Sequence, residues 1–180
     1  RFEEWHDELL NADYWERNLW NGILAQQHPD TGMISYHLPF FAGAEKVWGT
    51  PTEDFWCCHG SLVQAHTNYA NHIWYAQEGG LTLSQYIPSE LTWKLDGQAV
   101  TIRLTQDLQL QSHHRPKSFA YELSVQCAQP VAFNLRLRLP WWLNGRAEVA
   151  VNGDAQPVEQ GTEGYVEISR IWRNDVVHLV

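Results

Sequence analysis

The stretch Gln77-Glu78-Gly79-Gly80 divides the sequence into two parts that have different hydrophobic patterns. Before it, apolar residues recur at the three- and four-residue spacing of helices, whereas after it short apolar runs alternate with polar residues, which is typical of strands. Paired glycines favour a turn between such segments. We therefore predict an α + β chain with two domains, the first covering residues 1–78 and the second covering residues 79–180.

The second part is predicted to be built from strands. The segments that indicate strands are 81–87, 91–95, 99–108, 119–127, 131–139, 147–151, 165–168 and 175–180. The dipeptides Asp96-Gly97, Asn144-Gly145 and Asn152-Gly153 are typical of hairpin turns. Several short strands separated by turn signals indicate an antiparallel β-sandwich.

The first part is predicted to begin with two antiparallel helices. Residues 1–10 resemble the end of a helix, and Asn11-Ala12-Asp13 is expected to break it. Asp13 and Glu16 have the spacing of a capping box for a second helix, which should continue to His28-Pro29.

Residues 33–55 are expected to form a long loop, which in a compact chain is usually functional or disordered, and its aromatic residues argue against disorder. Ser61 and Gln64 have the spacing of a further capping box, so a third helix is predicted from Ser61 to about residue 76.

The composition limits the classes of function. Of the 180 residues, 44% are hydrophobic and 18% are charged, which indicates a globular chain. The net charge of −9 argues against binding to nucleic acid or to an anionic membrane surface. The 10 tryptophans and seven tyrosines either fill the core and interfaces or line a carbohydrate site. Because the chain starts at Arg1, inside an expected helix, we expect it to be a fragment.

The adjacent pair Cys57-Cys58 is the leading candidate for chemistry. Neighbouring Cα atoms lie about 3.8 Å apart, which is short for a disulfide. The pair is expected just before a helix N-terminus, which stabilises a thiolate, and two thiolates could supply half of a tetrahedral zinc site. His59 and Glu53 are the nearest other ligand candidates, whereas Cys127 lies in a strand-like run and is expected to be buried. Two buried structural cysteines are the alternative, and a redox pair fits the spacing less well.

Two other residue types could contribute. Glu53 and Asp54 are the carboxylates closest to the cysteine pair, so either could contact a substrate. Histidines are usually solvated or hydrogen-bonded residues, but His59 adjoins the thiols and should lie in the same pocket.

Several motifs together resemble the family 127 glycoside hydrolases, which are the β-L-arabinofuranosidase-like enzymes. The matching segments are 14–24, 30–39, 55–60, 85–90, 135–142, 151–153 and 164–172. The resemblance implies the last helices of an (α/α)6 barrel followed by a β-sandwich domain. It also implies a retaining exo-glycosidase that removes terminal sugars from plant-type glycans.

The resemblance assigns roles to individual residues. It implies that Cys57 is both the nucleophile and a zinc ligand, and that Cys58 is a second ligand of the Zn²⁺ ion. We further expect Trp56, His59, Glu53 and Tyr36 to contact the carbohydrate substrate. The remaining zinc ligands, a Glu and a Cys of a Glu-x-Cys motif, and the acid/base Glu are expected upstream of Arg1.

Some positions depart from the family pattern. His59-Gly60-Ser61 stands where many relatives have Pro-Pro-Asn, which leaves the sugar open, and Asn174-Asp175 replaces Gly-Asp. A catalytically inactive glycan-binding relative and a zinc-stabilised structural relative are the alternatives. The expected partners are a carbohydrate and the upstream barrel of the same protein, with no nucleic acid and no membrane. A homodimer is left open, as is a bacterial cytoplasmic or periplasmic location.

Overall fold

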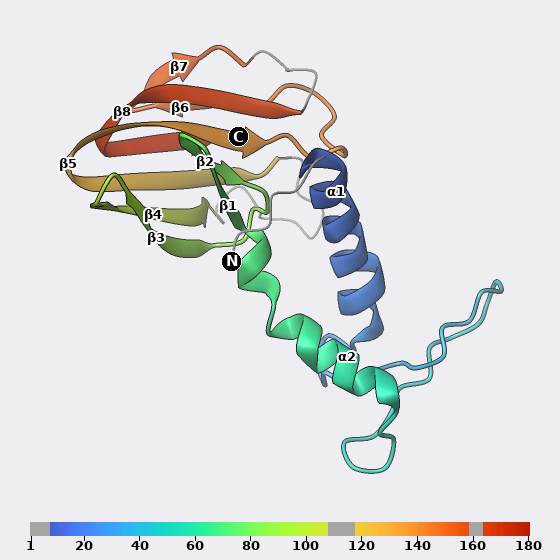
Figure 1. Ribbon diagram of the computed structural model, residues 1–180. Coiled ribbons are helices and arrows are strands. Elements are labelled where there is room, and N and C mark those ends of the chain that lie inside the picture. Colours follow the sequence, from blue (N-terminus) through green and yellow to red (C-terminus); the bar gives the residue numbers. More distant parts are fainter. Residues whose placement is uncertain (1–7, 108–117, 159–163) are drawn as a thin grey trace. The chain divides into compact units, whose positions relative to one another are not determined.

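The computed structural model describes residues 8–107, 118–158 and 164–180 (Figure 1). Its Cα positions divide the chain into two compact units. The helical unit runs from Leu10 to His72, and the sheet unit contains Ile73–Val180. Among the described residues, no helix is both long enough and apolar enough to cross a membrane.

The chain enters the helical unit through one continuous run of helical turns. Its elements are α1 (Glu8–Asn18), the π-helical turn η1 (Leu19–Ile23) and the 3₁₀ turn η2 (Leu24–Gln26). The prediction of two antiparallel helices with a break at residues 11–13 is therefore wrong. Residues 11–13 contain no glycine or proline, and burial of Ala12 favours a helix that continues through them. Residues 1–7 of the first predicted helix lie outside the described residues.

The second helix begins earlier and ends earlier than predicted. Helix α2 covers Cys57–His66, and the 3₁₀ turn η3 (Tyr69–His72) follows it. Trp56 is the N-cap, with the extended backbone angles φ −91° and ψ 163°. Ser61 consequently lies inside the helix and does not cap it. The segment after η3 becomes a strand because Ile73 and Trp74 are buried in the core of the sheet unit.

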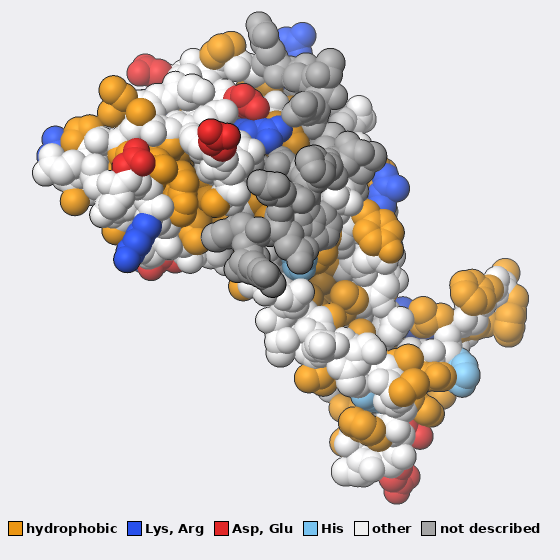
Figure 2. All heavy atoms as spheres, viewed as in Figure 1, with side chains coloured by type: hydrophobic (Ala, Val, Ile, Leu, Met, Phe, Trp, Pro, Cys, Tyr) orange, Lys and Arg blue, Asp and Glu red, His pale blue; other side chains and the backbone are white. Residues whose placement is uncertain are grey.

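The long loop before α2 is irregular, as predicted, and backbone hydrogen bonds tie it to η2 and to its own first residues. Ser35 N–H donates to the Gln26 carbonyl at 2.9 Å, and Gly49 N–H donates to the Ile34 carbonyl at 2.9 Å. Between these anchors the chain extends away from α2 as a narrow arm (Figure 1). Phe40 on this arm is 100% exposed, and hydrophobic side chains gather on the visible face of the arm and of α2 (Figure 2).

The sheet unit contains one connected sheet of eight strands. The strands are β1 (Trp74–Gln77), β2 (Gly80–Leu83), β3 (Ser89–Leu95), β4 (Gln98–Asp107), β5 (Ala120–Arg138), β6 (Val149–Val151), β7 (Asp154–Gln156) and β8 (Tyr165–Leu179). The main order is β1-β2-β5-β8-β6-β7, and β4 joins β3 to β5. Because β2 runs parallel to β5, the sheet is mixed and not purely antiparallel as predicted.

Two long strands replace four of the predicted short ones. Strand β5 unites the predicted segments 119–127 and 131–139, and β8 unites 165–168 and 175–180. The register between β5 and β8 shifts between Gln126 and Val131. Pro130 lies at this shift, where the missing N–H of proline costs no ladder hydrogen bond. In Figure 1 both β5 and β8 curve strongly, so each of them runs through both halves of the bent sheet.

The core of the sheet unit follows from strand alternation. Inward positions on β4 are occupied by Val100, Ile102 and Leu104, each at most 1% exposed. Trp172 is fully buried, stacks on the ring of Phe133 at 5.3 Å and donates its indole N–H to the Phe133 carbonyl at 3.0 Å. Cys127 is buried in β5, which confirms its prediction.

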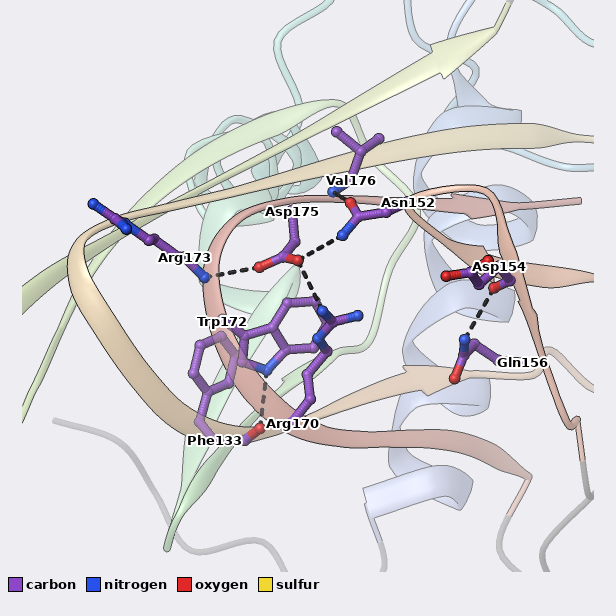
Figure 3. A network of polar contacts seen from close by, with 9 residues as sticks. All are labelled: Phe133, Asn152, Asp154, Gln156, Arg170, Trp172, Arg173, Asp175 and Val176. Carbon is purple, nitrogen blue, oxygen red and sulfur yellow. Dashed lines mark hydrogen bonds and ion pairs between the residues drawn. The ribbon is translucent and has the colours of Figure 1, made fainter.

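A polar network around the buried carboxylate of Asp175 holds the bend in β8 opposite the register shift (Figure 3). The carboxylate of Asp175 accepts hydrogen bonds from the Asn152 amide at 2.7 Å and from the Arg173 backbone N–H at 2.7 Å. The Arg170 guanidinium lies 3.0 Å from the same carboxylate and over the Trp172 ring. This network ties the β6–β7 turn to the bend of β8.

The hairpin turns are confirmed at two of the three predicted dipeptides. Asp96 and Gly97 both have positive φ angles, 51° and 80°, between β3 and β4. Asn152 and Gly153 have φ angles of 54° and 89° between β6 and β7. Two successive positive angles are those of the tight hairpin turn that Asx-Gly favours. Asn144-Gly145 lies in the connection from β5 to β6, which do not pair, so this hairpin prediction is wrong.

Candidate functional site

The two thiols occupy the first turn of α2. The sequence placed them just before the helix, whereas the structure places them inside it. Cys57 is exposed, Cys58 is partly buried, and their sulfur atoms lie 3.9 Å apart. That separation is about twice a disulfide bond length, so the cysteines are free thiols. The unpaired N–H groups and the dipole of a helix N-terminus favour negative charge there. The position therefore suits one or two thiolates.

Tyr36 reaches the sulfur atoms from the loop. Its hydroxyl lies near enough to both sulfurs for them to change its pKa. The hydrogen bond with Cys57, followed by the negative charges of the two sulfurs, raises the pKa of Tyr36 above its ordinary value. The pKa of Cys58 is also raised, first by its hydrogen bond with Cys57 and then by partial burial, although Tyr36 acts to lower it.

Aromatic rings surround this end of α2. The Tyr36 and Trp56 rings lie 5.1 Å apart, and the His59 ring stacks at 5.1 Å on Phe55 and at 5.5 Å on Trp56. The Trp56 backbone N–H donates to His59 Nδ1 at 3.0 Å, which favours the neutral tautomer with its proton on Nε2, and the same Nδ1 also lies 3.1 Å from the Trp56 carbonyl oxygen. Flat apolar faces and one N–H donor thus adjoin the thiols.

The acidic residues before α2 form a local turn of their own. The Glu53 backbone N–H donates to Thr50 Oγ1 at 3.0 Å, and Asp54 Oδ2 accepts a hydrogen bond from the Thr50 N–H at 2.9 Å. The Glu53 side chain is exposed. Within the described ranges, no hydrogen bond or ion pair joins Glu53 to Tyr36 or to either cysteine. The structure therefore brings Tyr36, Trp56 and His59 together with the thiols more directly than it brings Glu53.

The cysteine pair fits two positions of a zinc site. Zinc–thiolate bonds of about 2.3 Å at a tetrahedral angle place two sulfurs about 3.8 Å apart, and the observed separation is 3.9 Å. Across residues 8–107, 118–158 and 164–180, no group of three or more His, Cys, Asp or Glu side chains could hold a metal ion. The described residues thus offer two sulfur atoms, which is half of the ligand set that a tetrahedral site requires.

Sequence reasoning missed how Tyr36 relates to the sulfurs. It placed Tyr36 against the substrate. Tyr36 precedes α2 by about 20 residues, and nothing in the sequence pattern shows that the loop brings it back to the start of that helix. It also placed the helix cap at Ser61, although the run of Phe55, Trp56 and His59 was a usable signal. A histidine three residues after an aromatic N-cap can accept that residue's N–H, as the glutamate of a capping box does.

Two protein-family models together match almost the whole chain. Residues 1–71 match the model of the β-L-arabinofuranosidase GH127 catalytic domain, and residues 80–180 match the model of the GH127 middle domain. No curated protein gives a significant match.

Solved structures give the same result. A GH127 β-L-arabinofuranosidase from Geobacillus stearothermophilus T6 is 27% identical, with a TM-score of 0.72 over 93% of this chain and 27% of that one. A structure described as a glycoside hydrolase is 21% identical, with a TM-score of 0.74 over 96% of this chain and 29% of that one. A GH127 β-arabinofuranosidase is 19% identical, with a TM-score of 0.75 over 93% of this chain and 28% of that one. The chain thus spans less than a third of the length of these structures.

The middle-domain model alone matches residues 80–180, which is more than half of the 180 residues. The catalytic-domain match covers the loop, Tyr36 and the cysteine pair. The chain therefore belongs to the GH127 β-L-arabinofuranosidase family, and it carries a segment of the catalytic domain followed by the middle domain.

Proposed function

We propose that the whole protein is a glycoside hydrolase that removes terminal β-L-arabinofuranosyl or closely related sugars from plant-type glycans, with Cys57 as its nucleophile. One observation carries this proposal: the exposed Cys57 sulfur lies at the N-terminus of α2, 3.9 Å from the Cys58 sulfur, in the segment that matches the catalytic domain. A solvent-accessible thiol at a helix N-terminus is the arrangement that makes cysteine a nucleophile.

The reaction that fits this arrangement retains the configuration at the anomeric carbon. In the first step, Cys57 Sγ attacks the anomeric carbon while the glycosidic C–O bond breaks, and a carboxylic acid protonates the departing oxygen. In the second step, the same carboxylate takes a proton from water, whose oxygen attacks the anomeric carbon as the C–S bond breaks. Two inversions give net retention. We assign the carboxyl group to a part of the protein other than residues 1–180.

Cys57 and Cys58 would hold a zinc ion in this proposal. Their sulfur separation fits two tetrahedral positions, and the remaining ligands would come from elsewhere in the protein. When bound, zinc keeps coordinating thiols deprotonated, which favours the reactive thiolate form. Helix α2 contributes to the same end through its terminal N–H groups.

The aromatic residues around the thiols would bind the sugar. The Trp56 and Tyr36 rings offer apolar faces to the C–H groups of a sugar ring, and His59 Nε2–H offers a donor to a hydroxyl. Glu53 is assigned to the outer part of the same site, because its exposed side chain is free to accept hydrogen bonds from sugar hydroxyls.

The test is hydrolysis of a panel of p-nitrophenyl glycosides by the full-length protein, with and without a chelator. We expect turnover of at least one arabinofuranoside or related pyranoside, with loss of turnover on chelation. Cys57→Ser should lower kcat at least about 1,000-fold with unchanged folding, whereas Cys127→Ala, a change at the third cysteine, should retain activity. Absence of turnover on every glycoside would instead support an inactive glycan-binding relative. Unfolding on chelation would support a zinc-stabilised scaffold.

A further inference from the structure

We infer that Gly49 is a positioning residue of the sugar site, because its lack of a side chain determines where the Trp56 ring lies. This inference rests on the proposed function, in which the Trp56 ring contacts the apolar face of a sugar. It goes further by giving a part in substrate binding to a loop residue that has no side chain of its own.

The Trp56 ring lies against the backbone at Gly49. A Cβ atom at Gly49 would be 3.2 Å from Cζ3 of the Trp56 indole and 3.3 Å from Cβ of Asp54. It would also be 3.3 Å from the carbonyl oxygen of Ile34. Ordinary contacts of a Cβ atom are 3.4–4 Å long. An alanine at this position would therefore push at least one of these three neighbours away.

The backbone conformation does not by itself require glycine here. Gly49 is not among the glycines with a positive φ angle, so alanine can adopt its backbone angles. The Gly49 N–H donates to the Ile34 carbonyl at 2.9 Å, and an alanine N–H can make the same hydrogen bond. The need for a small residue thus comes from the space that its neighbours leave.

Of these neighbours, the backbone of Ile34 is held in place. Ile34 pairs with Gln27 in an isolated bridge, and the N–H of the next residue, Ser35, donates to the Gln26 carbonyl at 2.9 Å. Ser35 is also fully buried. Moving the Ile34 carbonyl would break these contacts, whereas the Trp56 indole can turn about its side-chain bonds. A methyl group at residue 49 should therefore displace the indole.

A displaced indole would disturb the rings that contact it. The Tyr36 ring lies 5.1 Å from the Trp56 ring at an interplanar angle of 31°, and the His59 ring stacks on it at 5.5 Å. All three residues are proposed to bind the sugar. Gly49 consequently acts on the substrate through Trp56, although it need not touch the substrate itself.

The effect is expected in substrate binding and not in bond breaking. An apolar contact with the sugar ring is made in the bound substrate and in the transition state alike, so weakening it raises KM and leaves kcat unchanged. For Gly49→Ala, KM for a p-nitrophenyl glycoside should rise about 3- to 10-fold, with kcat within about twofold of the parent. A general loss of folded protein would lower the apparent kcat instead.

A double-mutant cycle in the full-length protein tests which neighbour matters. Trp56→Phe replaces the indole with a smaller ring, which leaves room for a methyl group at residue 49. Adding Gly49→Ala to Trp56→Phe should therefore change KM by less than about twofold, so the two effects are not additive. Gly22→Ala in η1 is the matched control, because a Cβ there would have only Asn18 Oδ1 near it, at 3.9 Å, and it should behave as the parent. Thermal unfolding of each variant identifies any folding defect.

The outcomes distinguish this inference from the proposed function. If Gly49→Ala raises KM by the same factor with Trp56 and with Phe at residue 56, contact with Ile34 or Asp54 is responsible and the inference is overturned. It is also overturned if Gly49→Ala equals the parent, acts only on kcat, or prevents folding in both backgrounds. In each of these cases the parent still turns over glycosides and the proposed function stands. If the parent hydrolyses no glycoside, the proposed function fails first and this inference fails with it.

Discussion

His59 Nδ1 accepts a hydrogen bond from the Trp56 backbone N–H at 3.0 Å, across the first turn of α2. The His59 backbone N–H in turn donates to the Trp56 carbonyl at 3.0 Å. These two contacts close the turn that carries Cys57 and Cys58. The imidazole thus satisfies a backbone N–H at the helix start, which is the part that a glutamate side chain has in a capping box.

His59→Ala should therefore destabilise the start of α2. Loss of a capping interaction costs about 1 kcal/mol of unfolding free energy, measured by urea denaturation. Ser61→Ala is the matched control, since Ser61 is exposed within α2 and should change stability by no more than about 0.5 kcal/mol. If Ser61→Ala were the more destabilising change, the cap would lie where the sequence pattern indicated and not at Trp56.

Gly80→Ala should destabilise the parallel pairing of β2 with β5. A Cβ atom at Gly80 would lie 2.5 Å from the Asn134 carbonyl oxygen, which belongs to the backbone of the paired strand. The strands would have to separate, at a cost of about 1–3 kcal/mol. The change is measured as a shift of the denaturation midpoint.

Gly60→Ala is the control for this prediction. Gly60 lies within α2, and a Cβ there would meet nothing within 4 Å. Alanine in a helix interior is favoured over glycine by about 1 kcal/mol, so this variant should be neutral or more stable. Equal destabilisation by both changes would contradict the close approach of β2 and β5.

The sequence was informative where local pattern and burial agree. The positive-φ turns at Asp96-Gly97 and Asn152-Gly153, the irregular loop and the buried Cys127 were all predictable, because each depends on a few neighbouring residues. The position of the cysteine pair at the start of a helix was also nearly right. Its helix begins four residues before the expected Ser61 cap.

Other features depend on contacts between distant segments. The parallel pairing of β2 with β5 joins Gly80 to Asn134, and no periodicity within either segment reveals its direction. Trp74 follows Tyr69 and Ile73 at helical spacing, but its burial in the sheet core makes it part of β1. The proximity of Tyr36 to Cys57 likewise depends on how the loop folds back on α2. Such contacts decide the sheet topology and complete the site.

Cys58→Ala should separate metal binding from nucleophilic attack. In the full-length protein we expect about one zinc ion per chain, and loss of one of the proposed ligands should lower metal affinity at least about 10-fold, measured by dialysis and metal analysis. Turnover should fall and recover in part at high zinc concentration, whereas Cys57→Ser should not recover. Unchanged zinc content in Cys58→Ala would contradict its assignment as a ligand.

Asp175→Asn should lower stability in a manner that depends on pH. Burial acts to raise the pKa of Asp175, but the hydrogen bonds from Arg173 and Asn152 and the charge of Arg170 outweigh it, so the pKa lies below its ordinary value. A depressed carboxyl pKa contributes stability that is fully present above the unfolded-state pKa of about 3.9 and is lost as pH falls through the folded-state pKa. At pH 7 the variant should be about 2 kcal/mol less stable, and this difference should narrow below pH 4.

Urea denaturation at pH 7, 5 and 3 measures that difference, and Glu167→Gln is its control. Glu167 pairs with Arg136 at 2.9 Å, but its side chain is 53% exposed. The Arg136 side chain is only 10% exposed, but it also hydrogen-bonds to Gln77 and lies over the Tyr165 ring. Its pair with the solvated Glu167 should therefore contribute no more than about 1 kcal/mol, so Glu167→Gln should have a small effect at every pH. If the Asp175→Asn difference were as large at pH 3 as at pH 7, the charged carboxylate would not be what stabilises the bend of β8. The contribution would then come from the shape of the side chain and its neutral hydrogen bonds, which asparagine could only partly reproduce.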